Sequence, residues 1–300
     1  MKNILITGGS GFVGIHLTIL LKANGYTVSL LTRKINPKLD IPQYLWNWEQ
    51  KQIDLQAIAK ADAIIHLAGA NVNGKRWNAS WKKEIYDSRI ESTAFLFDII
   101  SKNANHLEAF ISASATGYYG CVTSEKIGHE DDLPSDDFLA NTCHHWELAA
   151  NKFTQLGIRT VMIRTGVVLS ENSEAYKKIS LPIRYGLGAS IGSGKQYFPW
   201  IHVDDLSGIY LKAVMDTNVQ GVFNAVAPDY ITNTQLMATL AKHFKKPFFL
   251  PNIPSFMIKI LFGEIADSLL NGSRISSEKI SGTGFKFKYS SIEDFVASLH

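Results

Sequence analysis

Residues 4–14 read Ile4-Leu5-Ile6-Thr7-Gly8-Gly9-Ser10-Gly11-Phe12-Val13-Gly14. The apolar run is typical of a buried strand, and the glycines that follow it open a helical pattern. Gly9, Gly11 and Gly14 have the G-x-G-x-x-G spacing, in which main-chain N–H groups and a helix dipole hold a diphosphate without a Cβ in the way. Because the glycines lie between a strand and a helix, we predict a dinucleotide-binding site here rather than only a tight turn.

The rest of the first half alternates short apolar runs with longer helical patterns. The apolar runs predict strands at Asn3–Thr7, Thr27–Thr32, Ala63–Leu67, Ala109–Ser114 and Arg159–Thr165. The helical patterns lie at Phe12–Asn24, Trp81–Ser101 and Phe138–Leu156. Strands and helices that alternate in this way, joined by right-handed crossovers, form a parallel sheet covered on both faces. The predicted fold class is therefore α/β, with a doubly wound parallel sheet of the Rossmann type.

The rhythm changes after about residue 170. Glycine-rich loops and shorter patterns follow, including a helix that Thr232 would cap. We expect residues 1–170 to form the dinucleotide-binding domain, with later segments such as 200–225 contributing to it. Residues 171–300 are expected to form a smaller C-terminal α/β portion on the substrate side.

The 300 residues carry a formal net charge of +3 and are 46% hydrophobic, which is typical of an ordinary globular protein. So small an excess of charge gives no electrostatic reason to expect nucleic acid or an anionic membrane as the main partner. Two cysteines, Cys121 and Cys143, are too few for a disulfide framework and fit a reducing compartment. No metal-ligand spacing, signal peptide or membrane-spanning run is seen, so we expect a cytoplasmic protein without a metal site.

The end of the second predicted strand bears on the choice of coenzyme. An NAD site usually has a carboxylate here that binds the ribose 2′-hydroxyl, but this chain reads Thr32-Arg33-Lys34 and has no acid until Asp40. A guanidinium can instead form a fork with a 2′-phosphate. We therefore expect NADP(H) to be preferred over NAD(H), while the same residues are also compatible with a solvated basic pair.

Further motifs carry a family resemblance. Together with the glycine pattern, three stretches resemble the extended short-chain dehydrogenase/reductase superfamily: Asp62-Ala63-Ile64-Ile65-His66-Leu67-Ala68-Gly69, Ser112-Ala113-Ser114-Ala115-Thr116 and Ile201-His202-Val203-Asp204-Asp205. Five more resemble its atypical "epimerase family protein" subgroup, some members of which carry an inherited cell-division-inhibitor label: Arg76-Trp77, Asp87–Ile90, Gly117–Gly120, Arg164–Leu169 and Gly192–Gln196. The resemblance covers nearly the whole chain, including the tail 253–300, which is similar to the subgroup's own C-terminal region.

The resemblance implies a set of cofactor contacts. It places Leu67, Ala68 and Gly69 against the adenosine side of the cofactor, and Arg89 where extended enzymes keep an asparagine. Arg89 is equally compatible with a surface arginine that has a solvated head. The cofactor-binding residues that we expect are Thr7, Gly8, Gly9, Ser10, Gly11, Phe12, Val13, Gly14, Thr32, Arg33, Leu67, Ala68, Gly69, Arg89, Ser112, Glu147 and Arg164.

The resemblance also implies where catalysis would occur. The superfamily uses a Ser or Thr, a Tyr, and a Lys four residues later that lowers the pKa of the Tyr. Ser114 matches the first of these, but Cys143 and Glu147 lie at the Tyr and Lys positions. A carboxylate there disfavours a phenolate or a thiolate, so the usual proton-transfer mechanism cannot simply be assumed. Cys143 also suits the role of a small buried residue.

Substitutes for the missing phenol lie nearby in the sequence. Tyr118 or Tyr119 closely follows the serine, and His144 or His145 could act as a general base, with at most one histidine on the inner face of its helix. All four also suit structural roles, as packing tyrosines and exposed helix histidines. The predicted catalytic residues are Ser114, Tyr118, Cys143 and Glu147.

From the resemblance we expect an NADP(H)-dependent oxidoreductase or epimerase that acts on a small carbonyl or hydroxyl metabolite with non-standard catalytic residues. One alternative is an NADP(H)-responsive binding or regulatory protein with reduced catalysis, and another is a lyase or isomerase without net hydride exchange. Analogy with the superfamily also allows a homodimer through the faces of Trp81–Ser101 and Phe138–Leu156.

Overall fold

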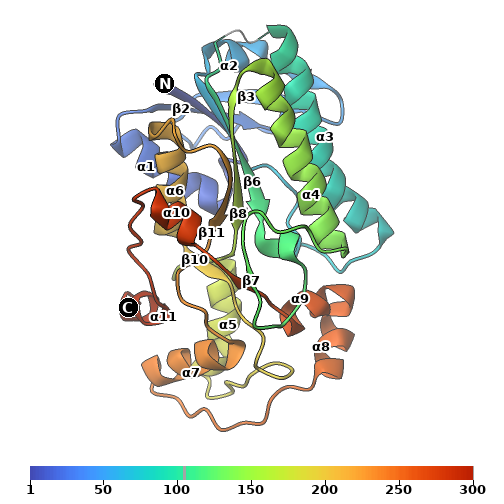
Figure 1. Cartoon of the computed structure of the whole chain (residues 1–300), viewed down its shortest axis with the longest axis vertical. Coiled ribbons are helices and arrows are strands. Elements are labelled where there is room, and N and C mark those ends of the chain that lie inside the picture. The colour runs from blue at the N-terminus through green and yellow to red at the C-terminus, as the bar shows by residue number, and fades with distance from the viewer. Residues whose placement is uncertain (104–105, 300) are drawn as a thin grey trace.

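A mostly parallel sheet of eight strands runs through the centre of the molecule (Figure 1). The structure is a computed structural model that describes residues 1–103 and 106–299. The strand order is β11-β8-β6-β5-β1-β2-β3-β4, and β4 pairs with β3 in the antiparallel direction. The strands are β1 (Asn3–Thr7), β2 (Thr27–Thr32), β3 (Gln43–Asn47), β4 (Gln52–Ile53), β5 (Ala63–His66), β6 (Ala109–Ala115), β8 (Arg159–Thr165) and β11 (Gly221–Ala225). The predicted doubly wound α/β fold is confirmed.

Helices cover both faces of this sheet. They are α1 (Phe12–Ala23), α6 (Val203–Met215) and α10 (Glu278–Gly282) on one face, and α2 (Leu55–Lys60), α3 (Ala79–Asn103) and α4 (Phe138–Asn151) on the other. The alternation within β1 explains the two layers, because Ile4 and Ile6 pack in the first cluster and Leu5 packs in the second. A sheet buried on both sides needs continuous apolar strands, which is the pattern that the sequence shows.

Two regions of the first half differ from the sequence prediction. The sequence patterns do not predict β3, β4 or α2, because β3 lies near the sheet edge and most of its residues are only half-buried, so it has no continuous apolar run. The helix predicted over Phe138–Leu156 is shorter as an α-helix. It ends at Asn151, and a 3₁₀ helix over Lys152–Leu156 leads into Gly157, which has a φ of +74°.

The second half of the chain adds further helices and two small sheets at the lower end of Figure 1. β10 (Trp200–His202) pairs with β9 (Val167–Leu169), and β12 (Arg274–Ile275) pairs with β7 (Ile127–Gly128). The helices are α5 (Glu174–Arg184), α7 (Asn233–His243), α8 (Ser255–Phe262), α9 (Ala266–Leu270) and α11 (Ile292–Ala297). Thr232 caps α7 through a capping box with Gln235, as its position in the sequence predicts. A separate apolar cluster that includes Tyr176, Trp200 and Phe295 stabilises this end.

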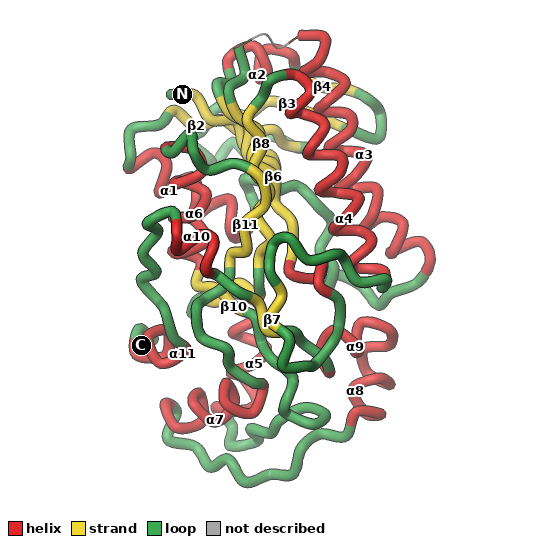
Figure 2. The backbone as a smooth tube through the Cα atoms, in the orientation of Figure 1, coloured by secondary structure: helices red, strands yellow, loops and turns green. Residues whose placement is uncertain are grey.

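Part of the later chain returns to the main sheet. β11 pairs with β8 at the sheet edge, and α6 packs against α1. Figure 2 shows the long loops that run between the sheet and the lower helices. These contacts bring segment 200–225 to the first half, while the domain division near residue 170 stays a prediction. The described part of the tail, 253–299, contains α8 to α11, and its last predicted residue, His300, lies outside the described residues.

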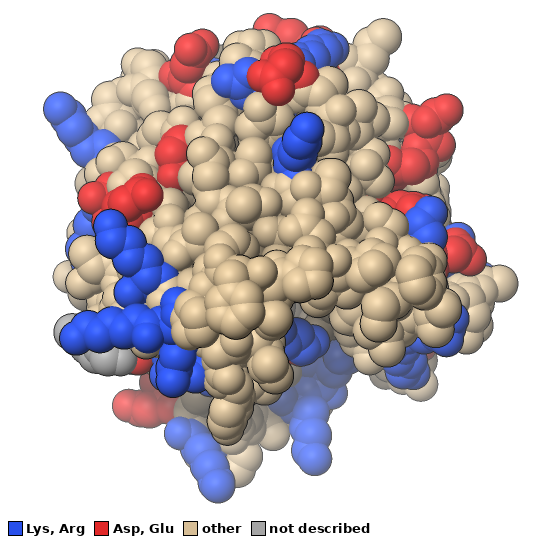
Figure 3. Space-filling view, turned by 90° about the horizontal axis from the view of Figure 1, so that it is seen from below, with Lys and Arg blue, Asp and Glu red and all other residues tan. Residues whose placement is uncertain are grey.

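Charged side chains are unevenly distributed over the lower end of the molecule. Figure 3 looks at this end and shows a broad central area without charged side chains, with Lys and Arg side chains gathered along one flank. Over residues 1–103 and 106–299, none of the helices combines the length and the hydropathy of a transmembrane span.

Candidate functional site

The glycine segment forms a tight turn between β1 and α1. Gly8 has a φ of +69°, and a Cβ there would lie 2.9 Å from the main-chain nitrogen of Ala68. A Cβ on Gly14 would lie 2.5 Å from Cα of Gly9, so turn and helix can pack this closely only with glycine. α1 begins after Gly11, and neither a side-chain cap nor an acidic residue is present in its first turn. The first main-chain N–H groups of α1 are therefore available to an anion.

A cleft of about 970 Å³ lies beside this turn, where the carboxyl ends of β1, β2 and β5 meet. Ligands of open α/β sheets bind at this edge, and the volume suits a small molecule. The predicted residues that line the cleft are Gly8, Ser10, Gly11, Thr32, Arg33, Leu67, Ala68 and Gly69. The predicted residues Thr7, Gly9, Phe12, Val13 and Gly14 belong to β1, the turn and the first turn of α1.

Sequence reasoning missed several residues of the cleft wall. Trp46 and Trp48 come from β3 and the residue after it, Lys75 comes from the loop after β5, and Trp81 comes from the first turn of α3. Lys75 Nζ lies 4.8 Å from the ring centroid of Trp81, which is a cation–π contact. The available signal is topological, since a loop that follows β5 leaves the sheet at the same edge as the glycine turn.

Arg33 follows the end of β2 and lines the cleft. Its side chain is exposed, and it forms neither a hydrogen bond nor an ion pair with any residue that the structure describes. Asp40, the next acid along the chain, is not among the residues that line the cleft. The guanidinium of Arg33 is therefore available to an anionic group of a ligand.

Arg89 projects from α3 toward the loop that follows β5. Its Nη1 donates a hydrogen bond to Ile85 O at 2.9 Å, and its Nη2 donates one to Ala70 O at 3.0 Å. A Cβ on Gly69 would lie 3.1 Å from Cζ of Arg89, so the guanidinium packs directly under this wall of the cleft. Burial lowers the pKa of Arg89 below its ordinary value. Arg89 thus stabilises the loop that borders the cleft.

Thr7 and His66 join β1 and β5 beneath the cleft. Thr7 Oγ1 accepts a hydrogen bond from Ala68 N at 3.1 Å and lies 2.7 Å from His66 Nδ1. Nε2 of the same ring lies 3.2 Å from Ser92 Oγ. Burial lowers the pKa of His66 to about 3, so the ring is neutral at physiological pH. The strands that carry the glycine turn are therefore held by a buried neutral network.

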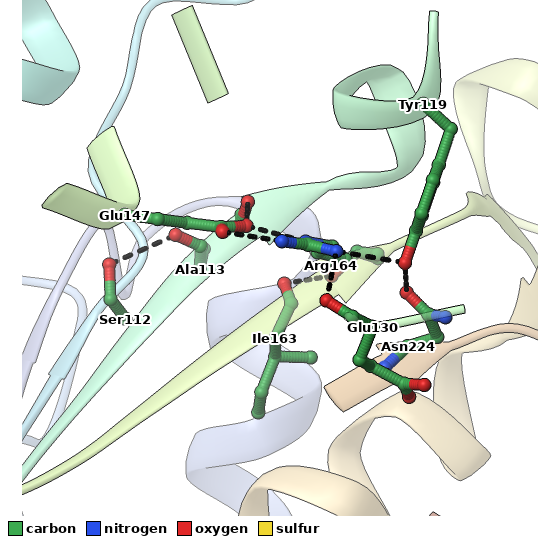
Figure 4. Close-up of polar contacts among 10 residues, drawn as sticks. Ser112, Ala113, Tyr119, Glu130, Glu147, Ile163, Arg164 and Asn224 are labelled. Carbon is green, nitrogen blue, oxygen red and sulfur yellow. Dashed lines mark hydrogen bonds and ion pairs between the residues drawn. The ribbon is translucent and has the colours of Figure 1, made fainter. Parts of the chain in front are cut away.

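A second cluster lies at the carboxyl ends of β6 and β8. Ser114 and Arg164 are register partners in these parallel strands, so their side chains emerge on the same face of the sheet. Glu147 reaches them from α4 (Figure 4). Ser114 Oγ donates to Glu147 Oε1 at 2.6 Å, and Arg164 donates from Nε to Oε1 and from Nη2 to Oε2, each at 2.8 Å.

The negative charge of Glu147 and the positive charge of Arg164 balance each other within this cluster. Ser114, Glu147 and Arg164 are all buried. Burial opposes the charge of Arg164, but its hydrogen bonds to Glu147 and the charge of that carboxylate raise the pKa of Arg164 above its ordinary value. The carboxylate of Glu147, which the resemblance puts at the usual lysine position, is therefore matched by a guanidinium, and both of its oxygens accept hydrogen bonds.

The cluster continues toward the second half of the chain. Arg164 Nη1 donates to Tyr119 Oη at 2.9 Å, and Tyr119 Oη donates to Asn224 Oδ1 at 2.7 Å. Asn224 N donates to Glu130 Oε1 at 2.8 Å, and Asn224 Nδ2 donates to Ser276 O. Burial raises the pKa of Tyr119 to about 12. Tyr119 is thus a half-buried member of the network that ties β8 to β11.

Tyr118 lies against the same arginine in a different way. The Cζ of Arg164 is 3.4 Å from the ring centroid of Tyr118, and the ring centroid of His144 is 6.2 Å from that of Tyr118. Burial raises the pKa of Tyr118, whereas the charge of Arg164 acts in the opposite direction. A cation therefore lies beside this phenol, although it is not a lysine.

The other predicted catalytic position behaves as a core residue. Cys143 is buried, and its Sγ would lie 3.7 Å from a Cβ on Gly117. Burial, followed by the charge of Glu147, raises the pKa of Cys143 to about 12, so the thiol is protonated at neutral pH. No three His, Cys, Asp or Glu side chains come together as a metal site would require in residues 1–103 and 106–299.

The remaining predicted residues have distinct surroundings. His144 is half-buried, whereas His145 is exposed with its Nδ1 3.0 Å from Tyr86 Oη, so one histidine lies on the inner side, as the helical spacing predicts. Ser112 Oγ donates to Ala113 O at 2.9 Å within β6 (Figure 4). Ser112, Ser114, Glu147 and Arg164 are not among the residues that line the cleft. Their roles toward a cofactor stay predictions.

Two family models match the chain. The model of the "NAD dependent epimerase/dehydratase family" matches residues 4–227, and the model described as "Domain of unknown function (DUF1731)" matches residues 253–299. The first covers the glycine turn, the cleft and the Ser114 cluster, and the second covers the tail.

Curated relatives are similar over their full length. The "Epimerase family protein SDR39U1" of Mus musculus is 33% identical over 302 residues, which cover 98% of this chain and 100% of the relative. The protein of the same name from Bos taurus is 35% identical and covers 96% of both chains. An epimerase family protein of Staphylococcus haemolyticus is 33% identical and covers 98% of this chain and 97% of the relative.

Solved structures agree with these matches. The crystal structure of human epimerase family protein SDR39U1 (isoform 2) with NADPH has a TM-score of 0.87 at 33% identity and covers 98% of both chains. A nucleoside-diphosphate sugar epimerase from Corynebacterium glutamicum has a TM-score of 0.80 at 30% identity, with 99% of this chain and 57% of that chain covered. The UDP-N-acetylglucosamine 4-epimerase from Bacillus cereus, at 20% identity and a TM-score of 0.76, shares the fold.

Proposed function

The chain belongs to the NAD dependent epimerase/dehydratase family, and from this premise we propose that it binds NADP(H) and transfers hydride to or from a small carbonyl or hydroxyl metabolite. The observation that carries the proposal is the cleft at the carboxyl ends of β1, β2 and β5, which the glycine turn and Arg33 both line. The available N–H groups of α1 suit a diphosphate, and the unpartnered guanidinium suits a phosphate monoester.

The proposed preference for NADP(H) is supported by charge. Arg33 lies at the end of β2, where an NAD site usually has a carboxylate, and its side chain has no competing acid in the described residues. The similar human protein was crystallised with NADPH. In this proposal Arg33 binds the 2′-phosphate, while Leu67, Ala68 and Gly69 form the adenosine side of the site.

The proposed chemistry uses Tyr118 as the proton donor. NADPH, when bound, supplies a hydride to the carbonyl carbon. The oxygen of that carbonyl gains negative charge and takes the phenolic proton, and the adjacent Arg164 stabilises the phenolate that remains. Ser114 already donates its hydroxyl hydrogen to Glu147, so it acts as an acceptor that positions a substrate hydroxyl. Glu147 and Arg164 fix the position of Ser114.

The test is an assay of turnover with a panel of carbonyl compounds and nucleotide sugars. The absorbance of NADPH measures the rate. Tyr118→Phe removes the proposed donor and should lower kcat by about 100-fold or more while leaving NADPH affinity unchanged. Tyr86→Phe is the matched control, because this partly exposed tyrosine lies on α3 and contacts only His145 through its hydroxyl. Equal kcat for wild type and Tyr118→Phe would refute the proposed donor.

A second candidate function is an NADP(H)-responsive binding protein. The observation that favours it is the Glu147–Arg164 pair, since both charged groups are satisfied by each other at the position where the superfamily keeps a catalytic lysine. In that case NADPH binds without turnover of any compound and changes the hydrodynamic radius or the set of associated proteins. A protein that turns over a substrate, or one whose hydrodynamic behaviour ignores NADPH, excludes this second function.

A further inference from the structure

α8 exposes one apolar face. Phe256, Met257, Ile260 and Leu261 are all exposed, and this i, i+1, i+4, i+5 spacing places them together on one side of the helix. Ile258, on the opposite side, is 4% exposed and anchors α8 to the molecule. Phe249, in the loop that leads to α8, is 77% exposed. We call Phe249 and the four exposed residues of α8 the α8 face.

Neighbouring loops extend this apolar area. Ile253 N donates to Ser190 O at 2.8 Å, and Asn252 Nδ2 donates to Gly192 O at 3.1 Å, so the loop before α8 runs beside the loop after α5. That second loop exposes Leu187, which is 63% accessible. Phe249, Leu187 and the exposed residues of α8 therefore lie on adjoining segments at the lower end of the molecule. Single exposed apolar residues are common, but a contiguous apolar area marks an interaction surface.

Lysines without partners lie close in the chain to Phe249. Lys242, Lys245 and Lys246 are exposed at the C-terminal end of α7, and none of them forms an ion pair or a side-chain hydrogen bond within the described residues. Lys246 precedes Phe249 by only three residues, so the charges and the aromatic ring belong to one short segment. Figure 3 shows the corresponding concentration of Lys and Arg on one flank of the uncharged area.

Two acidic side chains that follow α8 in the chain are paired with lysines. Glu264 pairs with Lys82, and Asp267 pairs with Lys259. The three unpaired lysines at the end of α7 give this short segment a local positive charge, although the net charge of the whole chain is only +3. The sequence-based expectation of no anionic membrane partner rests on that net value, and the fold concentrates charge in a way that the net value does not show.

We propose that this end of the molecule docks on the surface of an anionic lipid bilayer. The apolar side chains of such a face enter the boundary between headgroups and acyl chains, and nearby lysines interact with anionic headgroups. Burial of apolar surface and electrostatic attraction then both contribute to binding. Aromatic rings such as Phe249 suit the interfacial layer, and lysine stems extend along apolar surface while their ammonium groups stay in water. The protein lies on the membrane and does not cross it. This inference does not depend on the proposed coenzyme or reaction.

The experiment is co-sedimentation of the full chain with vesicles of phosphatidylcholine, with and without phosphatidylserine. We expect binding to the vesicles that contain phosphatidylserine and a decline as salt is raised. The variant Ile260→Glu with Leu261→Glu should lower the partition coefficient by about tenfold or more, since two apolar side chains no longer enter the bilayer. Lys245→Ala with Lys246→Ala should lower it by about 25-fold, at about fivefold for each lysine.

Matched controls separate docking from damage. Ile19→Glu changes an apolar residue of α1 that is 64% exposed, and Lys22→Ala removes a lysine from the last turn of α1. Both should bind vesicles like the wild type, and circular dichroism should show that every variant is folded. Failure to bind either vesicle, equal binding to both vesicles, or equal loss in the controls overturns the proposal. A dimer in solution that the α8 variants dissociate, without vesicle binding, assigns the face to a second copy instead.

Discussion

Arg164 donates two parallel hydrogen bonds to Glu147, from Nε to Oε1 and from Nη2 to Oε2, and both are 2.8 Å long. Both residues are buried, and the family resemblance puts Glu147 at the usual lysine position. Ser114 donates to the same carboxylate, so the pair also fixes the one residue that matches the usual serine. Glu147 therefore fixes the hydroxyl of Ser114, and the guanidinium of Arg164 lies against the ring of Tyr118.

The first prediction concerns the stability of this pair. Glu147→Gln leaves the buried charge of Arg164 without its counter-ion and should lower the free energy of unfolding by about 3–5 kcal/mol. The double variant Glu147→Leu with Arg164→Met removes both charges and should recover most of that loss. Urea denaturation of Glu147→Leu, Arg164→Met and the double variant gives the coupling energy. Additive effects of the two substitutions would show that the pair is not coupled.

Coenzyme preference gives the second prediction. Arg33→Ala should lower the affinity for NADPH by about 10- to 100-fold and leave the affinity for NADH nearly unchanged. The reason is that only NADPH carries the phosphate that a guanidinium would bind. Isothermal titration with both coenzymes measures the difference. Lys38→Ala is the control, since this exposed residue is not part of the cleft lining. Equal losses of affinity for the two coenzymes would show that Arg33 does not bind the 2′-phosphate.

The third prediction tests the close packing of the glycine turn. A Cβ on Gly14 would lie 2.6 Å from Gly8 O as well as close to Gly9, and both neighbours are main chain that cannot rotate away. Gly14→Ala should therefore distort the turn and lower the free energy of unfolding by about 1–3 kcal/mol. The affinity for NADPH should fall by about tenfold or more. Gly282→Ala is the control, because a Cβ there meets nothing within 4 Å. An unchanged affinity for NADPH in Gly14→Ala would show that the turn is not part of the binding site.

The pH dependence of stability supplies the fourth prediction. The pKa of His66 is about 3 in the folded protein against an ordinary value of 6.5, so between these values the unfolded chain binds the proton that the folded chain does not. Stability is therefore lost as pH falls through this window, and His66 accounts for about 2 kcal/mol between pH 7 and pH 5. His66→Gln should show a loss of stability over this pH range that is smaller by that amount. An unchanged pH profile in His66→Gln contradicts the burial argument.

Sequence patterns predicted the centre of the fold because its strands are buried on both faces. β1 has no polar residue between Asn3 and Thr7, so its apolar run and the following glycines are visible without any tertiary information. β3 is partly exposed near the sheet edge, and its pattern is therefore indistinct. The tryptophans that it adds to the cleft, Trp46 and Trp48, could not be assigned to the site for the same reason.

The charge pair was harder to predict than the cleft. Glu147 and Arg164 were each identified as site residues, but their contact depends on how α4 covers β6 and β8. Ser114 and Arg164 occupy equivalent places in two strands of equal length, so the register that aligns them is a signal that the sequence does contain. The direction of the α4 side chains over that register is a property of packing, and no local pattern encodes it.

The central claim is that the glycine turn and Arg33 hold a phosphorylated dinucleotide. Isothermal titration of the wild-type chain with NADPH and then with NADH tests it most directly. We predict saturable heat with NADPH and an affinity at least about tenfold lower for NADH, in line with the loss of one charge-assisted contact. The absence of heat with both coenzymes, or tighter binding of NADH, would contradict the account.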